Sequence, residues 1–331
     1  MDNLDFLKGK TVLVTGGTGS FGQKFVDRLI QLNVCKKIII FSRDEFKQHQ
    51  MQQRLIKQGL FNPILLRFFL GDVRDLSRLQ RAFAGVDIVI HAAALKQVPA
   101  LEFNPLEAIK TNIGGTQNAI DAALDAGISK VLLISTDKAV NPINLYGGTK
   151  FCAEKLLIAA NAYCPESEKH RAFSAVRYGN VIGSRGSIVE ILNEQKKTGV
   201  VTLTDEKMTR FWITIDQSVD LVLYALREMS GGEIFIPKLP AMKLPDLISA
   251  IAPKCQMKVV GIRPGEKLHE MLMTEDEVRR ARDAGEYYII EPNHNWWNGS
   301  YLKDFPRLPE NFVYASDKTE FLDKKDFLKF I

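Results

Sequence analysis

The sequence predicts an α/β protein with a doubly wound, mostly parallel sheet and a smaller α/β substrate-binding region. Two observations predict this class. Apolar runs rich in β-branched residues alternate with helical patterns through the first half of the chain, and strict alternation of strand and helix is typical of βαβ units. A glycine-rich turn follows the first of these runs, where such Rossmann-like sheets bind nucleotides.

The expected strands are short apolar runs, as in parallel strands that are covered on both faces. They span residues 11–14, 37–41, 65–70, 88–91 and 131–135. The expected helices lie between and after them, at residues 21–32, 45–58, 76–84, 105–126 and 149–162.

The second half of the chain is less regular. Residues 174–183 and 231–240 still resemble strands, but Pro and Gly become frequent and charged helical patterns near the end break the alternation. We therefore expect a Rossmann domain over residues 1–179 and a mainly substrate-binding region over residues 180–331. About residues 212–238 are expected to return to the main sheet.

Composition sets limits on function. The 331 residues are 46% hydrophobic and 25% charged, which is enough for one large or two modest globular cores. The 44 basic and 39 acidic residues are spread along the chain, so the net charge of +5 requires no nucleic-acid partner. No apolar stretch approaches the ~20 residues of a membrane span, and the start of the chain does not resemble a signal peptide. We expect a cytoplasmic protein.

The four cysteines, Cys35, Cys152, Cys164 and Cys255, are scattered, without CxxC spacing or histidines placed to complete a zinc site. We expect buried free thiols and no bound metal.

The glycine-rich turn TVLVTGGTGSFGQKF carries Gly16, Gly19 and Gly22 between a predicted strand and a predicted helix. Glycines there allow a tight turn and close approach of the backbone to a pyrophosphate at the helix N-terminus. A GxxGxxG pattern alone is weak, and a turn needed only for packing is the alternative. Its position in the first βαβ unit favours a dinucleotide site.

The end of the second strand, FSRDEFK, indicates which dinucleotide is bound. An NAD site usually places an acidic residue there for the ribose 2′-hydroxyl. Here Ser42 and Arg43 take that place, and Lys47 follows one helical turn later. These groups favour the 2′-phosphate of NADP. The alternative is that Asp44 contacts the ribose.

Two further segments are expected at the cofactor. Asp72 in GDVRD could accept from the adenine amino group or cap the next helix, a role that Asp75 can also fill. In HAAALKQVP, Ala92, Ala93 and Ala94 allow the backbone to lie close to the cofactor, and Lys96 follows them.

The segment STDKAVNPINLYGGTK begins at the carboxyl end of the fifth strand, where open α/β sheets bind their ligands. Tyr146 and Lys150 lie one helical turn apart. A lysine beside the phenol lowers its pKa, so Tyr146 can accept the proton of a hydroxyl while hydride leaves the same carbon.

Thr136, Asp137 and Lys138 exceed what alcohol oxidation needs, because one base and one orienting hydroxyl are enough for that step. An adjacent acid and amine suit an elimination, with Lys138 as base at the carbon α to a ketone and Asp137 as acid at the departing oxygen. Lys138 then needs a lowered pKa, which burial near NADP⁺ and Lys150 would give. A solvated turn is the alternative.

The motifs GGTGSFG, SRDE, GDVRD, HAAALKQVP, STDKAVNPINLYGGTK, RYGNVIGSRGS, MTRFW and RPGEKLHE resemble those of the extended short-chain dehydrogenase/reductases. They are most similar to the inverting UDP-N-acetylglucosamine 4,6-dehydratases that open the pseudaminic acid pathway. The resemblance spans about residues 8–275. Lys138 stands where dTDP-glucose 4,6-dehydratases carry Glu, and Tyr146 stands where large membrane-anchored, C5-retaining dehydratases typically carry Met.

The resemblance implies a lyase that uses tightly bound, recycled NADP on UDP-N-acetylglucosamine and forms a homo-oligomer, a dimer or a hexamer. Tyr146 and Thr136 would act at C4, Lys138 at C5 and Asp137 at C6. The expected cofactor contacts are Gly16, Thr18, Gly19, Ser20, Phe21, Gly22, Ser42, Arg43, Lys47, Asp72, Val73, Ala92, Ala93, Ala94, Lys96, Tyr146 and Lys150. The expected substrate contacts are Lys96, Tyr146, Asn180, Val181, Arg185, Thr204, Arg210, Arg263 and Glu266.

Three other functions stay open at this stage. A C5-retaining dehydratase or a UDP-sugar 4-epimerase would use the same fold and substrate class. A non-catalytic NADP-binding sensor would not need both Tyr146 and Lys150.

Overall fold

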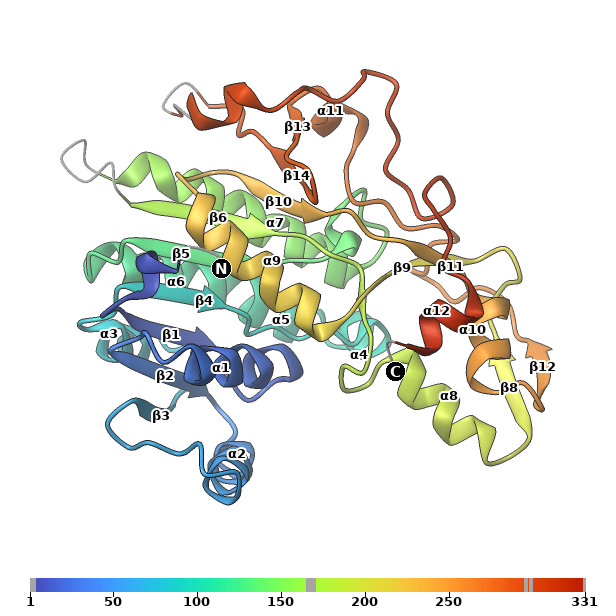
Figure 1. The fold of residues 1–331 in the computed structure, drawn as a ribbon, viewed down its shortest axis with the longest axis horizontal. Helices are drawn as coiled ribbons and strands as arrows, with labels where there is room; N and C mark the ends of the chain where they lie inside the picture. Colours follow the sequence, from blue (N-terminus) through green and yellow to red (C-terminus); the bar gives the residue numbers. More distant parts are fainter. Residues whose placement is uncertain (1–3, 165–170, 295–296, 298–299, 330–331) are drawn as a thin grey trace.

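The computed structural model describes residues 4–164, 171–294, 297 and 300–329. In this part of the chain nine strands form one large sheet in the order β13-β14-β10-β6-β5-β4-β1-β2-β3 (Figure 1). The seven strands β10, β6, β5, β4, β1, β2 and β3 run parallel to one another. The strands β14 and β13 extend the sheet beyond β10 in antiparallel fashion. The predicted doubly wound α/β fold is therefore confirmed.

The strands of this sheet are short and apolar, and the inner ones are buried along their whole length because helices cover both faces. They are β1 (Thr11–Thr15), β2 (Lys37–Ser42), β3 (Leu66–Leu70), β4 (Ile88–His91), β5 (Lys130–Ile134), β6 (Ala172–Val176), β10 (Ile234–Pro237), β13 (Ala281–Asp283) and β14 (Tyr287–Ile290).

Two layers of helices cover the sheet (Figure 1). On one face α1 packs against α9, and on the other α6 packs against α3 and α7. Side chains begin several of these helices: Asp44 and Asp75 cap α2 and α3, and Thr214 forms a capping box with Gln217 at α9. The helices are α1 (Ser20–Leu32), α2 (Glu45–Lys57), α3 (Leu76–Phe83), α6 (Gly115–Asp125), α7 (Leu145–Ala159) and α9 (Ile215–Glu228).

A smaller region lies beside the carboxyl ends of the parallel strands and has its own apolar core around Trp212 and Phe327 (Figure 1). Its strands are β7 (Asn180–Val181), β9 (Thr209–Ile213) and β11 (Ala241–Lys243) in one sheet, and β8 (Val200–Leu203) and β12 (Gln256–Val259) in another. Its helices are α8 (Ile188–Lys196), α10 (Leu244–Ile251) and α12 (Lys324–Leu328).

Short helical segments connect these layers. They are α4 (Val98–Phe103), α5 (Pro105–Ala108), α11 (Glu275–Val278), the 3₁₀ turns η1 (Asp5–Leu7), η3 (Asp137–Ala139), η4 (Ala160–Tyr163) and η6 (Ser300–Asp304), and the π-helical η2 (Ile109–Gly114). The helix expected over residues 105–126 is thus divided into α5, η2 and α6.

Several other details differ from the expectations. Helix α7 begins at Leu145, four residues earlier than expected, because Asn144 caps it by accepting from the Gly147 amide. The strands β13 and β14 extend the main sheet, although no strand was expected over these residues. The expectation of buried cysteines holds only for Cys35, because Cys164 and Cys255 are partly exposed and Cys152 is exposed.

Candidate active site

A cavity of about 680 Å³ lies at the carboxyl ends of the parallel strands, between the main sheet and the loop after β7. All of the residues expected to bind the cofactor lie on its wall. Thr136, Lys138, Asn180, Val181 and Arg185 also line it. The structure therefore brings the glycine-rich turn, the ends of β2 and β4, and most of the expected catalytic residues to one space.

The glycine-rich turn is packed too closely for side chains. Gly16 has φ +65°, and a Cβ there would lie 2.9 Å from the Ala93 Cα in the loop after β4. A Cβ on Gly22 would lie 2.6 Å from the Gly17 Cα. The turn therefore needs glycine for both conformation and close approach, which leaves its backbone open to the cavity.

At the end of β2 the cationic side chains are Arg43 and Lys47, and the carboxylate of Asp44 is already bound. Ser42 is buried and its Oγ accepts from Gln48 Nε2 at 3.1 Å. Asp44 accepts from the Lys47 amide at 2.9 Å and pairs with Lys47 Nζ at 3.0 Å, so its carboxylate is used as a helix cap. Arg43 has a half-exposed side chain whose Nη1 lies 3.9 Å from Asp72 Oδ2.

Asp72 is held at the next strand end by Arg74, whose Nη2 donates to Asp72 Oδ2 at 2.7 Å. This hydrogen bond lowers the pKa of the Asp72 carboxyl, so it stays ionised. Val73, the next residue, packs on α6, where a Cβ on Gly115 would lie 2.6 Å from the Val73 Cγ2.

The loop after β4 is fixed by a buried asparagine that sequence reasoning missed. Asn112 Oδ1 accepts from the Leu95 amide at 2.8 Å, and Asn112 Nδ2 donates to the Leu95 carbonyl and to Thr149 Oγ1. This side chain joins the loop to η2 and α7. Lys96 follows Leu95, and burial lowers its pKa.

The segment after β5 forms a compact polar cluster. Asp137 is fully buried and its Oδ1 accepts from Thr136 Oγ1 at 2.9 Å and from Lys138 Nζ at 3.0 Å. Lys138 Nζ also lies 3.4 Å from Asn180 Oδ1 at β7. Tyr146 and Lys150 face the same cavity from α7. The expected acid, amine, phenol and hydroxyl are thus brought together.

The ionisation of these groups differs from expectation. Lys150 donates to the Ile134 carbonyl at 2.7 Å, and burial lowers its pKa to about 8. The charges that act on the Tyr146 phenol are those of Lys138 and Asp137, and burial outweighs the effect of Lys138, so its pKa is raised. The expectation that Lys150 lowers the pKa of Tyr146 is not met in this structure.

The expected fall in the pKa of Lys138 is also wrong for this structure. Burial alone would lower the pKa of Lys138, but the carboxylates of Asp137 and Glu270 outweigh burial and raise it. Burial also raises the pKa of Asp137, against the opposing charge of Lys138. In this pair Lys138 retains its proton more strongly than an ordinary lysine, and the neighbouring Asp137 binds a proton more readily than an ordinary aspartate.

The expected substrate residues in the second half fall into two groups. Arg185 donates through its amide to Ser20 Oγ at 3.0 Å and through Nη2 to the Thr18 carbonyl at 2.7 Å, so it contacts the glycine-rich turn. Arg210 is buried outside the cavity wall, 3.6 Å from Glu266. Thr204 is buried against Met208, and Arg263 is exposed, with its amide 3.4 Å from Glu266.

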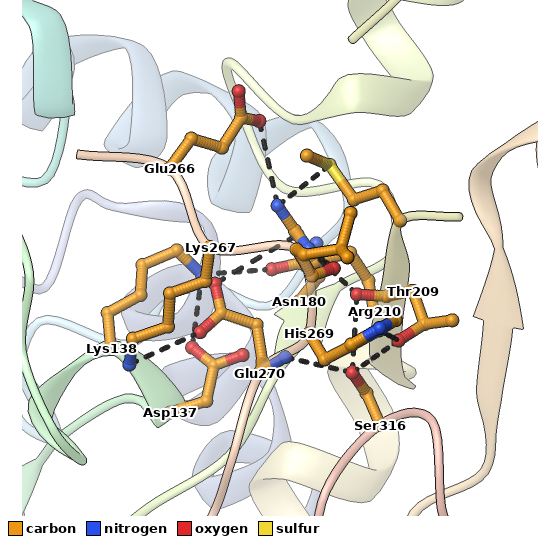
Figure 2. Close-up of polar contacts among 12 residues, drawn as sticks. Asp137, Lys138, Asn180, Thr209, Arg210, Glu266, Lys267, His269, Glu270 and Ser316 are labelled. Carbon is orange, nitrogen blue, oxygen red and sulfur yellow. Dashed lines mark hydrogen bonds and ion pairs between the residues drawn. The ribbon is translucent and has the colours of Figure 1, made fainter. Parts of the chain in front are cut away.

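A second carboxylate in this neighbourhood was missed by sequence reasoning. Glu270 is buried at the end of RPGEKLHE, and its Oε1 lies 3.6 Å from Lys138 Nζ (Figure 2). Its motif was noted in the sequence, but no local pattern indicates that this position lies beside residue 138. The chain end also contributes, because the Ser316 Oγ accepts from the Glu270 amide at 2.9 Å.

Within residues 4–164, 171–294, 297 and 300–329, no helix is both long enough and apolar enough to cross a bilayer.

Residues 12–292 match the model of a family described as polysaccharide biosynthesis protein. The chain belongs to this family. Among its relatives is a UDP-N-acetylglucosamine 4,6-dehydratase (inverting) of Campylobacter jejuni subsp. jejuni serotype O:23/36 (strain 81-176). The two are 48% identical, and the match covers 98% of this chain and 97% of the relative. The resemblance to this group of extended short-chain dehydrogenase/reductases is confirmed.

Family members carry more than one name. A Rickettsia akari (strain Hartford) relative, 44% identical over 96% of this chain and 92% of its own length, is named UDP-glucose 4-epimerase. Among solved structures, that of Pen from Bacillus thuringiensis has a TM-score of 0.88 and 35% identity, and covers 97% of this chain and 96% of that one.

Proposed function

We propose that this protein is a UDP-N-acetylglucosamine 4,6-dehydratase that inverts C5 and yields UDP-2-acetamido-2,6-dideoxy-β-L-arabino-hexos-4-ulose. The observation that carries the proposal is the Asp137–Lys138 pair, joined at 3.0 Å. Lys138 lines the cavity that Tyr146 and Lys150 also face, and Asp137 lies buried directly behind it. The name of the Campylobacter relative supports the substrate and the inversion. The product would enter the pseudaminic acid pathway.

The first step is oxidation at C4. When bound, NADP supplies the site with a hydride acceptor that later returns the hydride to C6. Tyr146 removes the proton of the C4 hydroxyl, and Thr136 holds the same oxygen. Lys150 has a pKa of about 8, so a modest change in its surroundings alters the charge beside the cofactor site.

The second step is elimination of water. Transfer of one proton from Lys138 Nζ to Asp137 Oδ1 along their 3.0 Å hydrogen bond converts the ion pair into a neutral amine and a carboxylic acid. Lys138 then removes the C5 proton, which the C4 ketone makes acidic, and Asp137 protonates the departing C6 oxygen. A proton reaches C5 from the opposite face when hydride returns, which inverts the centre.

We propose NADP rather than NAD as the resident cofactor. Support comes from the end of β2, where the Asp44 carboxylate is already bound by the Lys47 amide and ammonium. Arg43 lines the cavity with a half-exposed guanidinium, which suits a 2′-phosphate.

We further propose that Asn180, Val181, Thr204, Arg210, Arg263 and Glu266 contact the nucleotide sugar, with Arg210 and Arg263 at the diphosphate and Glu266 at the ribose. Arg210 already pairs with Glu266 at 3.6 Å, so a diphosphate would have to compete with that carboxylate. Arg185 is proposed to bind the diphosphate from the loop that contacts the glycine-rich turn. Assembly into a homo-oligomer is part of the same proposal.

The epimerase name of the Rickettsia relative makes UDP-sugar 4-epimerisation the second candidate. The two reactions share oxidation at C4, and only the dehydratase needs the acid and the amine. Lys138→Met separates them. For a dehydratase the variant still reduces its bound cofactor when UDP-N-acetylglucosamine is added, seen as absorbance of reduced nicotinamide, but forms no C6 methyl group. An unchanged turnover to the C4 epimer would establish the epimerase.

A further inference from the structure

We propose that Glu270 is a positioning residue of the Asp137–Lys138 pair, whose carboxylate shares the Lys138 ammonium with Asp137 and thereby sets the pH at which the pair exchanges its proton. This inference deepens the proposed function and rests on it for the meaning of the exchange. The contact between Glu270 and Lys138 can be tested without any turnover.

Glu270 is surrounded by charged groups from three separate segments (Figure 2). Its Oε1 lies 3.6 Å from Lys138 Nζ in η3 and 3.9 Å from Arg210 Nε in β9, and its Oε2 lies 3.7 Å from Lys267 Nζ. The charged groups that act on Glu270 are Asp137, Lys138, Arg210 and Lys267. Two further titratable groups lie in the same cluster: Glu266 pairs with Arg210 at 3.6 Å, and His269 Nδ1 is bonded to Thr209 Oγ1 at 2.8 Å.

Each carboxylate of the cluster has one buried oxygen that accepts no hydrogen bond, although Glu270 Oε2 lies 3.7 Å from Lys267 Nζ. Asp137 Oδ2 and Glu270 Oε2 have no hydrogen-bond partner among the described residues. A buried carboxylate oxygen without a donor is unfavourable. The two acids therefore compete for the protons of Lys138, and neither is saturated by other donors.

The segment that carries Glu270 is firmly docked. Gly265 O accepts from Asn144 Nδ2 at 2.7 Å, and Lys267 Nζ donates to the Val140 carbonyl at 2.5 Å. At its other end the Glu270 amide and carbonyl both bond to Ser316, which is itself fully buried. These contacts fix Glu270 against the turn that holds Asp137 and Lys138, as a positioning residue requires.

Removal of the Glu270 charge has a defined sign. Its carboxylate favours the charged form of Lys138 and disfavours the charged form of Asp137. Loss of that charge lowers the pKa of both groups. Both limbs of the pH profile for turnover should then move to lower pH together, whereas a purely structural role would lower kcat without moving either limb.

Lys138 can be observed directly by its rate of acetylation with acetic anhydride, resolved by mass spectrometry of the peptide that contains it. Only the neutral amine reacts, so each unit of lowered pKa raises the rate about tenfold. We expect Glu270→Gln to raise the Lys138 rate about tenfold or more at a fixed pH. Glu270→Asp withdraws the carboxylate by one methylene and should raise the rate less, by about two- to fivefold.

The matched control is Glu291→Gln. Glu291 is a buried carboxylate paired with Arg282 at 2.7 Å beside β14, and its loss should leave the Lys138 rate unchanged. The inference is overturned by an unchanged Lys138 rate in both Glu270 variants, by a rise in Glu270→Asp equal to that in Glu270→Gln, or by fixed limbs of the pH profile. If circular dichroism shows that Glu270→Gln is not folded, the acetylation rate of Lys138 in Glu270→Asp decides the test by itself. A raised rate then supports the inference, and an unchanged rate overturns it.

The two levels of the proposal fail separately. Wild-type protein that forms no methyl-bearing sugar from UDP-N-acetylglucosamine refutes the proposed function and leaves the acetylation result intact. An unmoved acetylation rate refutes the role of Glu270 and leaves the methyl product intact.

Discussion

Gly147 in α7 packs directly against the turn that carries the catalytic pair. A Cβ at this position would lie 2.1 Å from the Lys138 carbonyl oxygen and 3.1 Å from the Pro142 Cβ. The next residue, Gly148, is also in α7, but a Cβ there meets nothing within 4 Å. Gly147→Ala and Gly148→Ala therefore form a matched pair. Both add one methyl group to α7, but only the methyl group at residue 147 collides with neighbouring atoms.

The clash sets the size of the effect. Real Cβ contacts essentially never fall under 3.0 Å, so α7 and the Lys138 backbone must separate by about 0.9 Å to accept Ala at Gly147. Tyr146 is the preceding residue and moves with α7. A displacement of about 1 Å at reacting groups lowers kcat about 100-fold, and overpacking of this kind lowers stability by about 1–3 kcal/mol.

Gly148→Ala should be neutral or stabilising by up to about 1 kcal/mol, because Ala is the better helix former. The assay measures kcat for methyl-group formation by NMR and the free energy of unfolding in urea for both variants. Equal kcat values in the two variants would refute the claim that contact between α7 and residue 138 sets the geometry of the site.

Three further predictions concern other parts of the molecule. Burial lowers the pKa of His91 to about 3, so the folded state is destabilised by about 1.4 kcal/mol per pH unit as pH falls below about 6.5. His91→Gln should reduce this loss, as measured by urea unfolding at pH of about 6.5 and 4. Equal losses of unfolding free energy in the wild type and the variant would show that the reasoning is wrong. Arg177→Met leaves the Glu154 and Glu277 carboxylates buried without their partner and should lower the free energy of unfolding by about 3–5 kcal/mol, a claim that a loss below about 1 kcal/mol would contradict. Arg43→Ala should weaken binding of NADP by about 10- to 100-fold and that of NAD far less, as measured by calorimetry, and equal losses for both would exclude Arg43 as the phosphate ligand.

The first half of the fold could be predicted because its strands are continuous apolar runs and its helices have side-chain caps. The start of α7 could not, because Gly147 and Gly148 lower helix propensity where the Asn144 cap and the contact with η3 begin the helix. The helix expected over residues 105–126 is present over Pro105–Asp125, but its π-helical part, Ile109–Gly114, could not be predicted. Asn112 in this part bonds to Leu95 and Thr149, and a local pattern does not specify such tertiary contacts.

For the candidate site, the sequence predicted which residues come together but not their protonation states. Motif order indicated which residues gather at the carboxyl ends of the strands, and Tyr146, Lys150, Thr136 and Lys138 do line one cavity. Ionisation was not predictable, because the pKa of Lys138 depends on Glu270, which lies 132 positions away in the chain. Neither the composition nor the spacing of motifs in the sequence shows which distant residues lie close together in the fold.

The central claim is tested most directly by proton NMR of UDP-N-acetylglucosamine incubated with the purified protein in D₂O, without added cofactor. The account predicts a new C6 methyl signal, deuterium at C5 and the couplings of the L-arabino product. A methyl signal with D-xylo couplings would retain the dehydratase and contradict inversion. UDP-N-acetylgalactosamine without any methyl signal would contradict the elimination, and with it the roles of Asp137 and Lys138.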